Sequence, residues 1–156
     1  MIRGKNVSAD AMLLRMMDLC ARSEQSSGEI REKLRRKGMA ASDVEKILAR
    51  LQADRFVDDA RFARAFVNDK VRFALWGRRK IRMALASKGV GQSLASEALS
   101  GIDDDEYWTA LMKAARAKSK GYDLSDFSER NKVFRSLASR GYELDLIAKA
   151  IRSLDE

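Results

Sequence analysis

The same helical pattern occurs three times in the chain at nearly constant spacing. Each copy has an aliphatic residue, a leucine four positions later, and then a basic residue directly before a glycine. The copies are Ile30, Leu34 and Lys37-Gly38; Ile81, Leu85 and Lys88-Gly89; and Val133, Leu137 and Arg140-Gly141. Successive glycines are 51 and 52 residues apart, which is typical of tandem helical modules. This spacing predicts three modules, over residues 8–54, 55–102 and 103–156, and the alternative is a chance similarity among amphipathic helices.

Each copy has the properties of a helix followed by its C-terminal stop. The apolar pair lies on one helical face, the glycine takes the left-handed conformation that ends a helix, and the basic residue complements the helix dipole. The chain also lacks proline and has few β-branched residues. We therefore predict an all-α protein of three tandem three-helix repeats. Its helices are expected near residues 8–24, 28–37, 43–53, 58–75, 78–88, 92–100, 104–119, 127–140 and 143–154.

Several helix starts are marked by a side-chain oxygen acceptor three residues before a carboxylate. This capping-box spacing occurs at Ser26 with Glu29, Ser42 with Glu45, and Asp103 with Glu106. Asp58-Asp59 is expected to cap the long helix that follows it. The acidic run from Asp103 to Glu106 is interpreted in the same way, as a cap that complements the helix dipole rather than a metal site.

Positive charge is concentrated in the middle module. The chain has a net charge of +8, and residues 55–88 hold ten basic side chains against three acidic ones. On the predicted helix that starts after Gly77, the arginines lie beside the buried stripe and form a cationic face. We predict that this face binds phosphates or carboxylates, and the alternative is an ordinary solvated helix face. The candidate binding residues are Arg72, Trp76, Arg78, Arg79, Lys80, Arg82 and Lys88, with Arg35 and Arg36 of the first module as a weaker cluster.

Aromatic residues alternate with these basic residues. Phe62, Phe66 and Phe73 share one face of the predicted helix at α-helical spacing, which predicts that they belong to the core. Trp76 stands next to Gly77 in the turn between two helices. It is therefore the candidate for exposure and for stacking on a nucleic-acid base.

The composition excludes most kinds of active site. The chain has no histidine and a single cysteine, Cys20, which excludes imidazole catalysis, an intrachain disulfide and a cysteine-cluster zinc site. Cys20 lies in an apolar helical stretch and is expected to be a buried structural thiol. No phosphate-binding loop appears. We predict a protein that is not an enzyme, with no cofactor, no metal and no small-molecule substrate.

Two further expectations concern the cellular location. No apolar run approaches the roughly 18 residues that a membrane span needs. The start of the chain, Met1 to Lys5, is charged, but no apolar stretch of signal-peptide type follows it. We therefore expect a cytoplasmic protein without a membrane partner.

Two stretches of the middle module resemble the bacterial RecX regulatory family. The family's aspartate pair and Arg-Phe-Ala sequence appear here as Asp58-Asp59-Ala60-Arg61-Phe62-Ala63. Its glycine, arginine, isoleucine, leucine and Lys-Gly pattern appears as Gly77, Arg79, Ile81, Leu85 and Lys88-Gly89. The flanking modules also resemble their family counterparts, and the similarity extends from about Ala9 to the C-terminus.

The resemblance implies three tandem three-helix repeats in an elongated, curved molecule. It also implies that the protein binds the RecA recombinase and its filament on single-stranded DNA, and inhibits the ATPase, strand-exchange and coprotease activities of RecA. On this hypothesis, Arg72, Arg78, Arg79 and Arg82 pair with RecA carboxylates, and DNA phosphates are a second set of candidate partners. The alternative function is a sequence-nonspecific nucleic-acid-binding module that acts without RecA.

Overall fold

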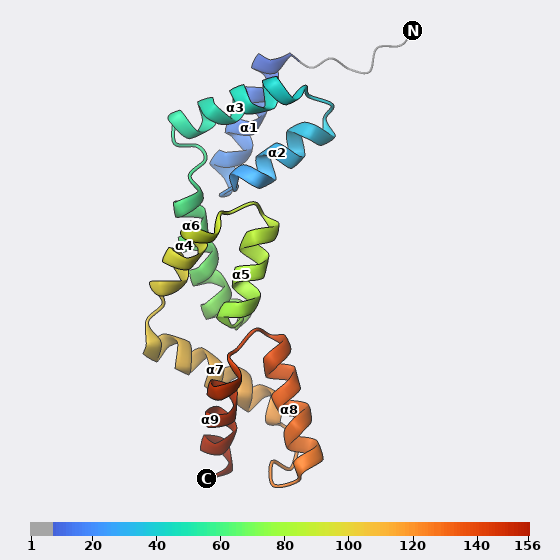
Figure 1. Ribbon diagram of the computed structural model, residues 1–156, viewed down its shortest axis with the longest axis vertical. Helices are drawn as coiled ribbons and strands as arrows, with labels where there is room; N and C mark the ends of the chain where they lie inside the picture. Colours follow the sequence, from blue (N-terminus) through green and yellow to red (C-terminus); the bar gives the residue numbers. More distant parts are fainter. Residues whose placement is uncertain (1–7) are drawn as a thin grey trace.

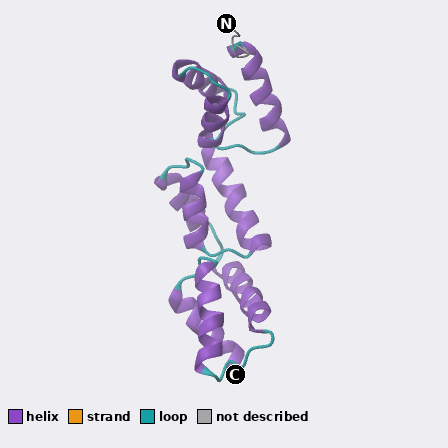
Figure 2. Cartoon of the chain, turned by 90° about the vertical axis from the view of Figure 1, so that its right-hand side faces the viewer, coloured by secondary structure: helices purple, strands orange, loops and turns teal. Residues whose placement is uncertain are grey.

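The protein is an elongated stack of three helical modules in the computed structural model, which describes residues 8–156 (Figure 1). Within this range the regular structure consists of nine α-helices and one π-helix, with no strand (Figure 2). The helices are α1 (Ala9–Arg22), α2 (Ser27–Arg36), α3 (Ala41–Ala53), α4 (Asp59–Asp69), the π-helix η1 (Lys70–Ala74), α5 (Arg78–Ser87), α6 (Gln92–Ser100), α7 (Asp104–Ser119), α8 (Phe127–Ser139) and α9 (Leu144–Asp155). The expected all-α fold of three tandem three-helix repeats is confirmed.

The proposed module boundaries, 8–54, 55–102 and 103–156, name the three modules below. None of the helices between residues 8 and 156 is long and apolar enough to cross a membrane. The charged start of the chain, on which the expectation of no signal peptide rests, falls within residues 1–7 and lies outside the described residues.

The apolar residues form two separate cores. The first module has a core of its own, centred on Met12, Ile30 and Leu34, which are completely buried. The second and third modules share one continuous core, in which Leu85 of α5 and Leu111 of α7 are completely buried. Burying an aliphatic side chain of this size contributes about 1.5–3 kcal/mol, so the two cores are the main source of stability. The first module is therefore joined to the rest chiefly through polar contacts.

The three repeated glycines end α2, α5 and α8 in the same way. Gly38, Gly89 and Gly141 have positive φ angles of 81°, 78° and 98°. In each case the residue after the glycine donates its backbone N–H to the carbonyl of the repeated leucine, and the glycine donates to the residue after that leucine. This is the Schellman arrangement, in which the left-handed residue satisfies two carbonyls of the last helical turn. The interpretation of the repeat as a helix and its stop is confirmed.

Only one of the three expected capping boxes is complete. Ser26 and Glu29 form a complete box, and Asp103 caps α7 by accepting a hydrogen bond from the backbone of Glu106 at 3.0 Å. The prediction at Ser42 is wrong, because α3 starts at Ala41 and Ser42 lies inside its first turn. Glu45 instead accepts two hydrogen bonds from Arg31 of α2, at 3.0 and 3.1 Å.

The helix expected over residues 58–75 changes its winding before its end. It is α-helical to Asp69 and continues as the π-helix η1, which ends at Leu75 in a left-handed conformation with a φ of 55°. A π-helix has more residues per turn, so side chains within it leave the stripe that α-helical spacing predicts. Phe62 is buried as expected, whereas Phe73 is 81% exposed and does not belong to the core.

A hydrogen bond to the equivalent carbonyl joins each module to the next. The residue before the first turn of α2, Ser26, donates its hydroxyl to the carbonyl of Lys88, at 2.6 Å. The corresponding residue of α5, Gly77, donates its N–H to the carbonyl of Arg140, at 2.8 Å. Lys88 and Arg140 occupy the same position of the repeat, directly before the helix-ending glycine. The Schellman turn of one module therefore accepts a hydrogen bond from the start of a helix in the preceding module.

Gly28 tests this junction, because a methyl group there would lie 2.3 Å from the carbonyl oxygen of Lys88. Helix propensity alone favours alanine over glycine by about 0.5–1 kcal/mol. We expect the opposite effect from Gly28→Ala. It should lower the free energy of unfolding by about 1–3 kcal/mol, because backbone atoms at the junction must move apart to admit the methyl group. Urea unfolding followed by circular dichroism measures the change.

Gly101→Ala is the matched control, since the nearest atom to its added methyl group would lie at 3.5 Å, an ordinary contact. We expect it to change the free energy of unfolding by less than about 0.5 kcal/mol. Equal stabilisation by both substitutions would show that the junction does not restrict Gly28.

Candidate partner-binding surface

The candidate binding residues surround α5 in the middle of the stack. Arg79 and Arg82 are exposed, and Arg78, Lys80 and Lys88 are half-buried. A groove of about 650 Å³ runs beside this helix, between it and the C-terminal end of α8. The groove is lined by Trp76, Arg79, Lys80, Met83, Ala84 and Ser87 of the middle module and by Ala138, Ser139 and Gly141 of the third. The structure thus places three of the sequence-predicted residues around one concave surface.

Trp76 is held in place by two lysines. The ammonium groups of Lys80 and Lys70 lie 4.4 and 4.8 Å from the centre of its ring. The ring also meets Phe66 edge-on, at a centroid distance of 6.3 Å. Trp76 is therefore partly buried and already engaged in cation–π contacts, so a base that stacked on it would have to displace a lysine.

Arg78 faces the interior of the molecule instead of a partner. Its side chain is 26% exposed, and its guanidinium lies 3.8 Å from the centre of the Tyr107 ring. It pairs with Glu143 at 2.8 Å and approaches Asp104 at 3.4 Å. Tyr107 donates its hydroxyl to Glu143 at 2.5 Å and accepts the backbone N–H of Arg78 at 2.9 Å. These bonds tie the start of α5 to α7 and α9.

The ionisation of this cluster follows from its surroundings. Burial opposes the charge on Glu143, but the hydrogen bonds from Tyr107 and Arg78 outweigh burial and hold the pKa of Glu143 below its usual value. Burial and the bond to Glu143 raise the pKa of the Tyr107 hydroxyl. At neutral pH the cluster therefore contains a carboxylate, a guanidinium and a neutral phenol, which donates to the carboxylate and has the guanidinium over its ring.

Four other candidate residues have carboxylate partners within the chain. Arg72 pairs with Glu106 at 2.9 Å, which adds a third ion pair between the middle and third modules. Lys88 pairs with Glu29 at 3.2 Å across the junction with the first module. Arg35 and Arg36 both bond to Glu32 on their own helix. The sequence pattern predicted that these cations bind a partner, whereas in the structure each of them pairs with a carboxylate of the same chain.

The remaining cations form a smaller surface, which we call the α5 patch: Arg79, Lys80 and Arg82. None of the three lies within 4.0 Å of a carboxylate in residues 8–156. Arg82 donates to the hydroxyl of Ser96 at 2.9 Å, and Lys80 lies over Trp76. An uncompensated set of guanidinium and ammonium groups beside a groove attracts carboxylates or phosphates.

Sequence reasoning missed two parts of this region. Met83 is 74% exposed on the same helix, and the signal was its position off the stripe formed by Ile81 and Leu85. Tyr107 and Glu143 come from distant parts of the chain, and no local pattern indicated that they would meet Arg78.

Cys20, expected to be buried, is half-exposed, and desolvation raises the pKa of its thiol. Within the described residues no group of three or more potential ligands could hold a metal ion.

Three sequence models of one protein family match the chain in succession. The first three-helix domain of RecX matches residues 13–51, the second matches 58–99, and the third matches 104–151. The chain belongs to the RecX family. Regulatory protein RecX of Ectopseudomonas mendocina is 34% identical over 142 residues, which cover 90% of this chain and 92% of that protein. RecX of Clostridium botulinum strain Alaska E43 is 32% identical over 84% of this chain, which corresponds to 62% of its own greater length.

Solved RecX structures have the same fold. The crystal structure of RecX from Lactobacillus salivarius superposes with a TM-score of 0.83, covers 94% of this chain and 96% of its own, and is 20% identical. A second crystal structure, of regulatory protein RecX, gives a TM-score of 0.81 at 22% identity and covers 93% of this chain and 71% of its own. The RecX family consists of regulatory proteins, so the expectation of a protein that is not an enzyme is confirmed.

The polar cluster at Arg78 generates a test of its structural role. We expect Glu143→Gln to lower the free energy of unfolding by about 1–3 kcal/mol at pH 7, because it leaves Arg78 only its longer contact with the exposed Asp104. The pKa of Glu143 is lower in the folded protein, so its stabilisation is complete above the unfolded pKa of about 4.3 and is lost as the pH falls through that region. The difference from the unsubstituted protein should therefore shrink between about pH 5 and pH 3.

Thermal unfolding at a series of pH values measures this difference. Glu97→Gln is the control, because Glu97 is exposed and forms no ion pair with the residues described. If Glu143→Gln lowered the free energy of unfolding equally at every pH, the effect would come from altered packing and not from the lost charge.

Proposed function

We propose that this chain regulates the RecA recombinase by binding its filament on single-stranded DNA, and that it lowers the ATPase, strand-exchange and coprotease activities of RecA. The observation that carries this proposal is the α5 patch, whose cations have no carboxylate partner within residues 8–156. Two of them, Arg79 and Lys80, line a groove together with the exposed Met83. Charged groups around an apolar contact are typical of protein interfaces. Membership of a family of regulatory proteins named RecX supports the same function.

The elongated stack suits a filament as the target. Three modules in a row present similar helices at successive positions along the molecule (Figure 1). A filament presents the same subunit surface repeatedly. Once one module has bound, a second module can bind the next subunit at a high effective concentration, which raises the overall affinity. The proposed site of action is the cytoplasm, and no cofactor or small-molecule substrate takes part.

The cations divide into two groups in this proposal. Arg79, Lys80 and Arg82 contact the acidic surface of RecA, with DNA phosphates as an additional partner. Arg72 and Arg78, which the sequence also assigned to RecA, act indirectly because they hold the third module in its orientation through Glu106 and Glu143. Lys88, Arg35 and Arg36 stay at the periphery of the contact.

The α5 patch provides the first test. We expect Arg79→Glu with Arg82→Glu to raise the concentration needed to inhibit the single-stranded-DNA-dependent ATPase of RecA by at least about tenfold, since about 1.4 kcal/mol of binding energy corresponds to that factor. The control is Lys113→Glu with Arg116→Glu, which reverses two exposed charges on α7 and should leave inhibition unchanged. Undiminished inhibition by a folded Arg79 and Arg82 variant would refute the assignment of the patch.

The second candidate function is nucleic-acid binding without RecA. Phe73, 81% exposed beside Arg72, is the observation that favours it, because an exposed ring next to a cation can stack on a base. Against it, the ring of Trp76 is occupied by two lysines.

A salt series separates these two functions. We expect the protein to bind the RecA-coated strand more tightly than bare single-stranded DNA at every salt concentration, because apolar contacts with RecA persist when phosphate contacts are screened. Fluorescence anisotropy with a labelled oligonucleotide measures both affinities. Equal affinity for the two, with the same steep dependence on salt, would favour the nucleic-acid-binding module.

A further inference from the structure

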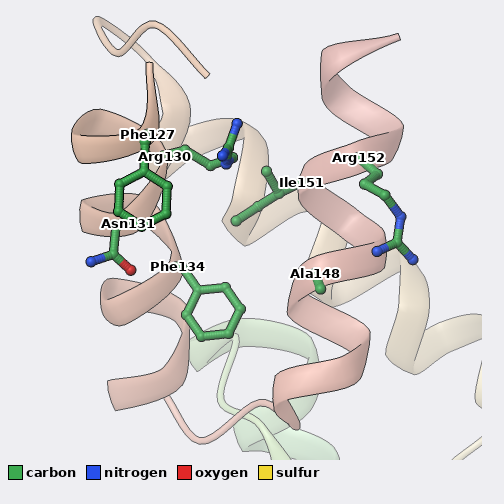
Figure 3. Close-up of a pocket in the computed structure, with 7 residues that line it drawn as sticks. All are labelled: Phe127, Arg130, Asn131, Phe134, Ala148, Ile151 and Arg152. Carbon is green, nitrogen blue, oxygen red and sulfur yellow. The ribbon is translucent and has the colours of Figure 1, made fainter. Parts of the chain in front are cut away.

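An apolar pocket lies in the third module, between the N-terminal half of α8 and the C-terminal half of α9 (Figure 3). Its volume is about 290 Å³, and it is lined by Phe127, Arg130, Asn131, Phe134, Ala148, Ile151 and Arg152. Phe134 and Ile151 point toward each other from the two helices and form its inner wall. Phe127 is 73% exposed at its edge. This pocket and the groove beside Trp76 lie at opposite ends of α8.

The corresponding position carries a polar bridge in the other two modules. In the repeat register set by the glycines, Phe134 corresponds to Arg82 and Arg31, and Ala148 corresponds to Ser96 and Glu45. Arg31 bonds to Glu45 through two nitrogens, at 3.0 and 3.1 Å. Arg82 donates to Ser96 at 2.9 Å. Only the third of these pairs is apolar. In the first module Arg31 and Glu45 also line a pocket, of about 480 Å³, so the pocket of the third module differs in having an apolar pair in place of the charged one.

The pocket also lies at the free end of the stack. The start of α2 is covered by the second module, and the start of α5 is covered by the third. The start of α8 has no following module among the described residues. The ring of Phe127, the first residue of α8, is exposed at this place. An exposed apolar site at this place indicates a binding surface.

The charges around the pocket have a single sign. Arg130 and Arg152 are its only charged lining residues, and neither pairs with a carboxylate in the part of the chain that the structure describes. Arg130 donates to the carbonyl of Leu124 at 3.2 Å, and its guanidinium lies 5.7 Å from the centre of the Phe127 ring. The occupant that complements this site therefore combines an apolar side chain with negative charge.

A second copy of the chain does not fit this requirement. The other end of the stack carries Lys33, Arg35, Arg36 and Lys37 at the C-terminal end of α2. Continuing the stack from one molecule to the next would bring these cations toward Arg130 and Arg152, and like charges repel. The complementary occupant is thus an acidic segment of a different protein.

We infer that this pocket docks an acidic amphipathic segment of a partner protein. The segment inserts one aromatic or aliphatic side chain between Phe134 and Ala148, and its carboxylates lie beside Arg130 and Arg152. This inference goes beyond the proposed function, because it concerns a different site and does not depend on the α5 patch.

A peptide titration of the full chain, labelled with ¹⁵N, tests the docking by NMR. The probe is a short synthetic peptide of Glu, Asp and Leu residues around one central Phe. We expect amide shifts to concentrate in the N-terminal half of α8 and the C-terminal half of α9. Replacing the central Phe by Ser should weaken binding about tenfold or more, because burying a phenylalanine contributes about 1.5–3 kcal/mol. Replacing the acidic residues by Gln should weaken it as well.

Two variants of the protein complete the test. Phe134→Arg with Ala148→Glu recreates the bridge of the first module, and it should replace the apolar contact with a charged pair and abolish the shifts. Arg130→Gln with Arg152→Gln leaves the apolar wall in place, and it should weaken binding without altering the fold. The matched control is Lys132→Gln with Arg135→Gln, which removes two exposed charges of α8 outside the pocket and should bind the peptide normally.

Several outcomes would overturn the inference. These are shifts centred on Arg79 and Arg82, equal binding of the peptide without Phe, or normal binding by the Arg130 and Arg152 variant. A single-stranded oligonucleotide that produced the same shifts more strongly than the peptide would assign the pocket to nucleic acid and also refute the proposal.

Discussion

The structure depends on one repeated contact between the glycine turn that ends a helix and the start of a helix in the preceding module. The Schellman turn needs a left-handed residue, which places a glycine on the surface with no side chain to keep a neighbour away. Gly89 and Gly141 use this freedom, since Gly28 and Gly77 approach them so closely that an added methyl group would overlap backbone atoms. The residue that stops one helix therefore also sets the distance to the next module, and the stack follows from repeating that contact.

Charge at the centre of the molecule serves two different purposes. Arg72, Arg78 and Lys88 lie at the junctions and pair with acidic residues of the neighbouring modules. Arg79 and Arg82 belong to the same short run of sequence but point elsewhere, and they remain available to a partner. A helix turns by about 100° per residue, so adjacent arginines inevitably face different surroundings. A basic stretch of sequence is thus a mixture of residues that pair within the chain and residues that do not, and only packing separates them.

The three modules share one backbone plan, while one facing pair of positions on the second and third helices has different side chains in each module. The pair is Arg31 with Glu45 in the first module, Arg82 with Ser96 in the second, and Phe134 with Ala148 in the third. The bridge changes from one ion pair with two hydrogen bonds to a single hydrogen bond, and then to an apolar pair without a bond. The buried leucines carry the fold in every module, so this exposed pair can change without loss of the core. Variation at such a position can give each module its own surface chemistry.

The sequence by itself determined the helices, the threefold repeat and the helix-ending glycines, because helix periodicity and left-handed glycines act over a few residues. It also located the excess of positive charge. Only the tertiary structure decided that Arg78 meets Tyr107 and Glu143, that Glu45 bonds to Arg31 instead of capping α3, and that η1 turns Phe73 toward solvent. These outcomes depend on side chains brought together from distant segments, or on winding that packing selects. Local spacing contains neither kind of information.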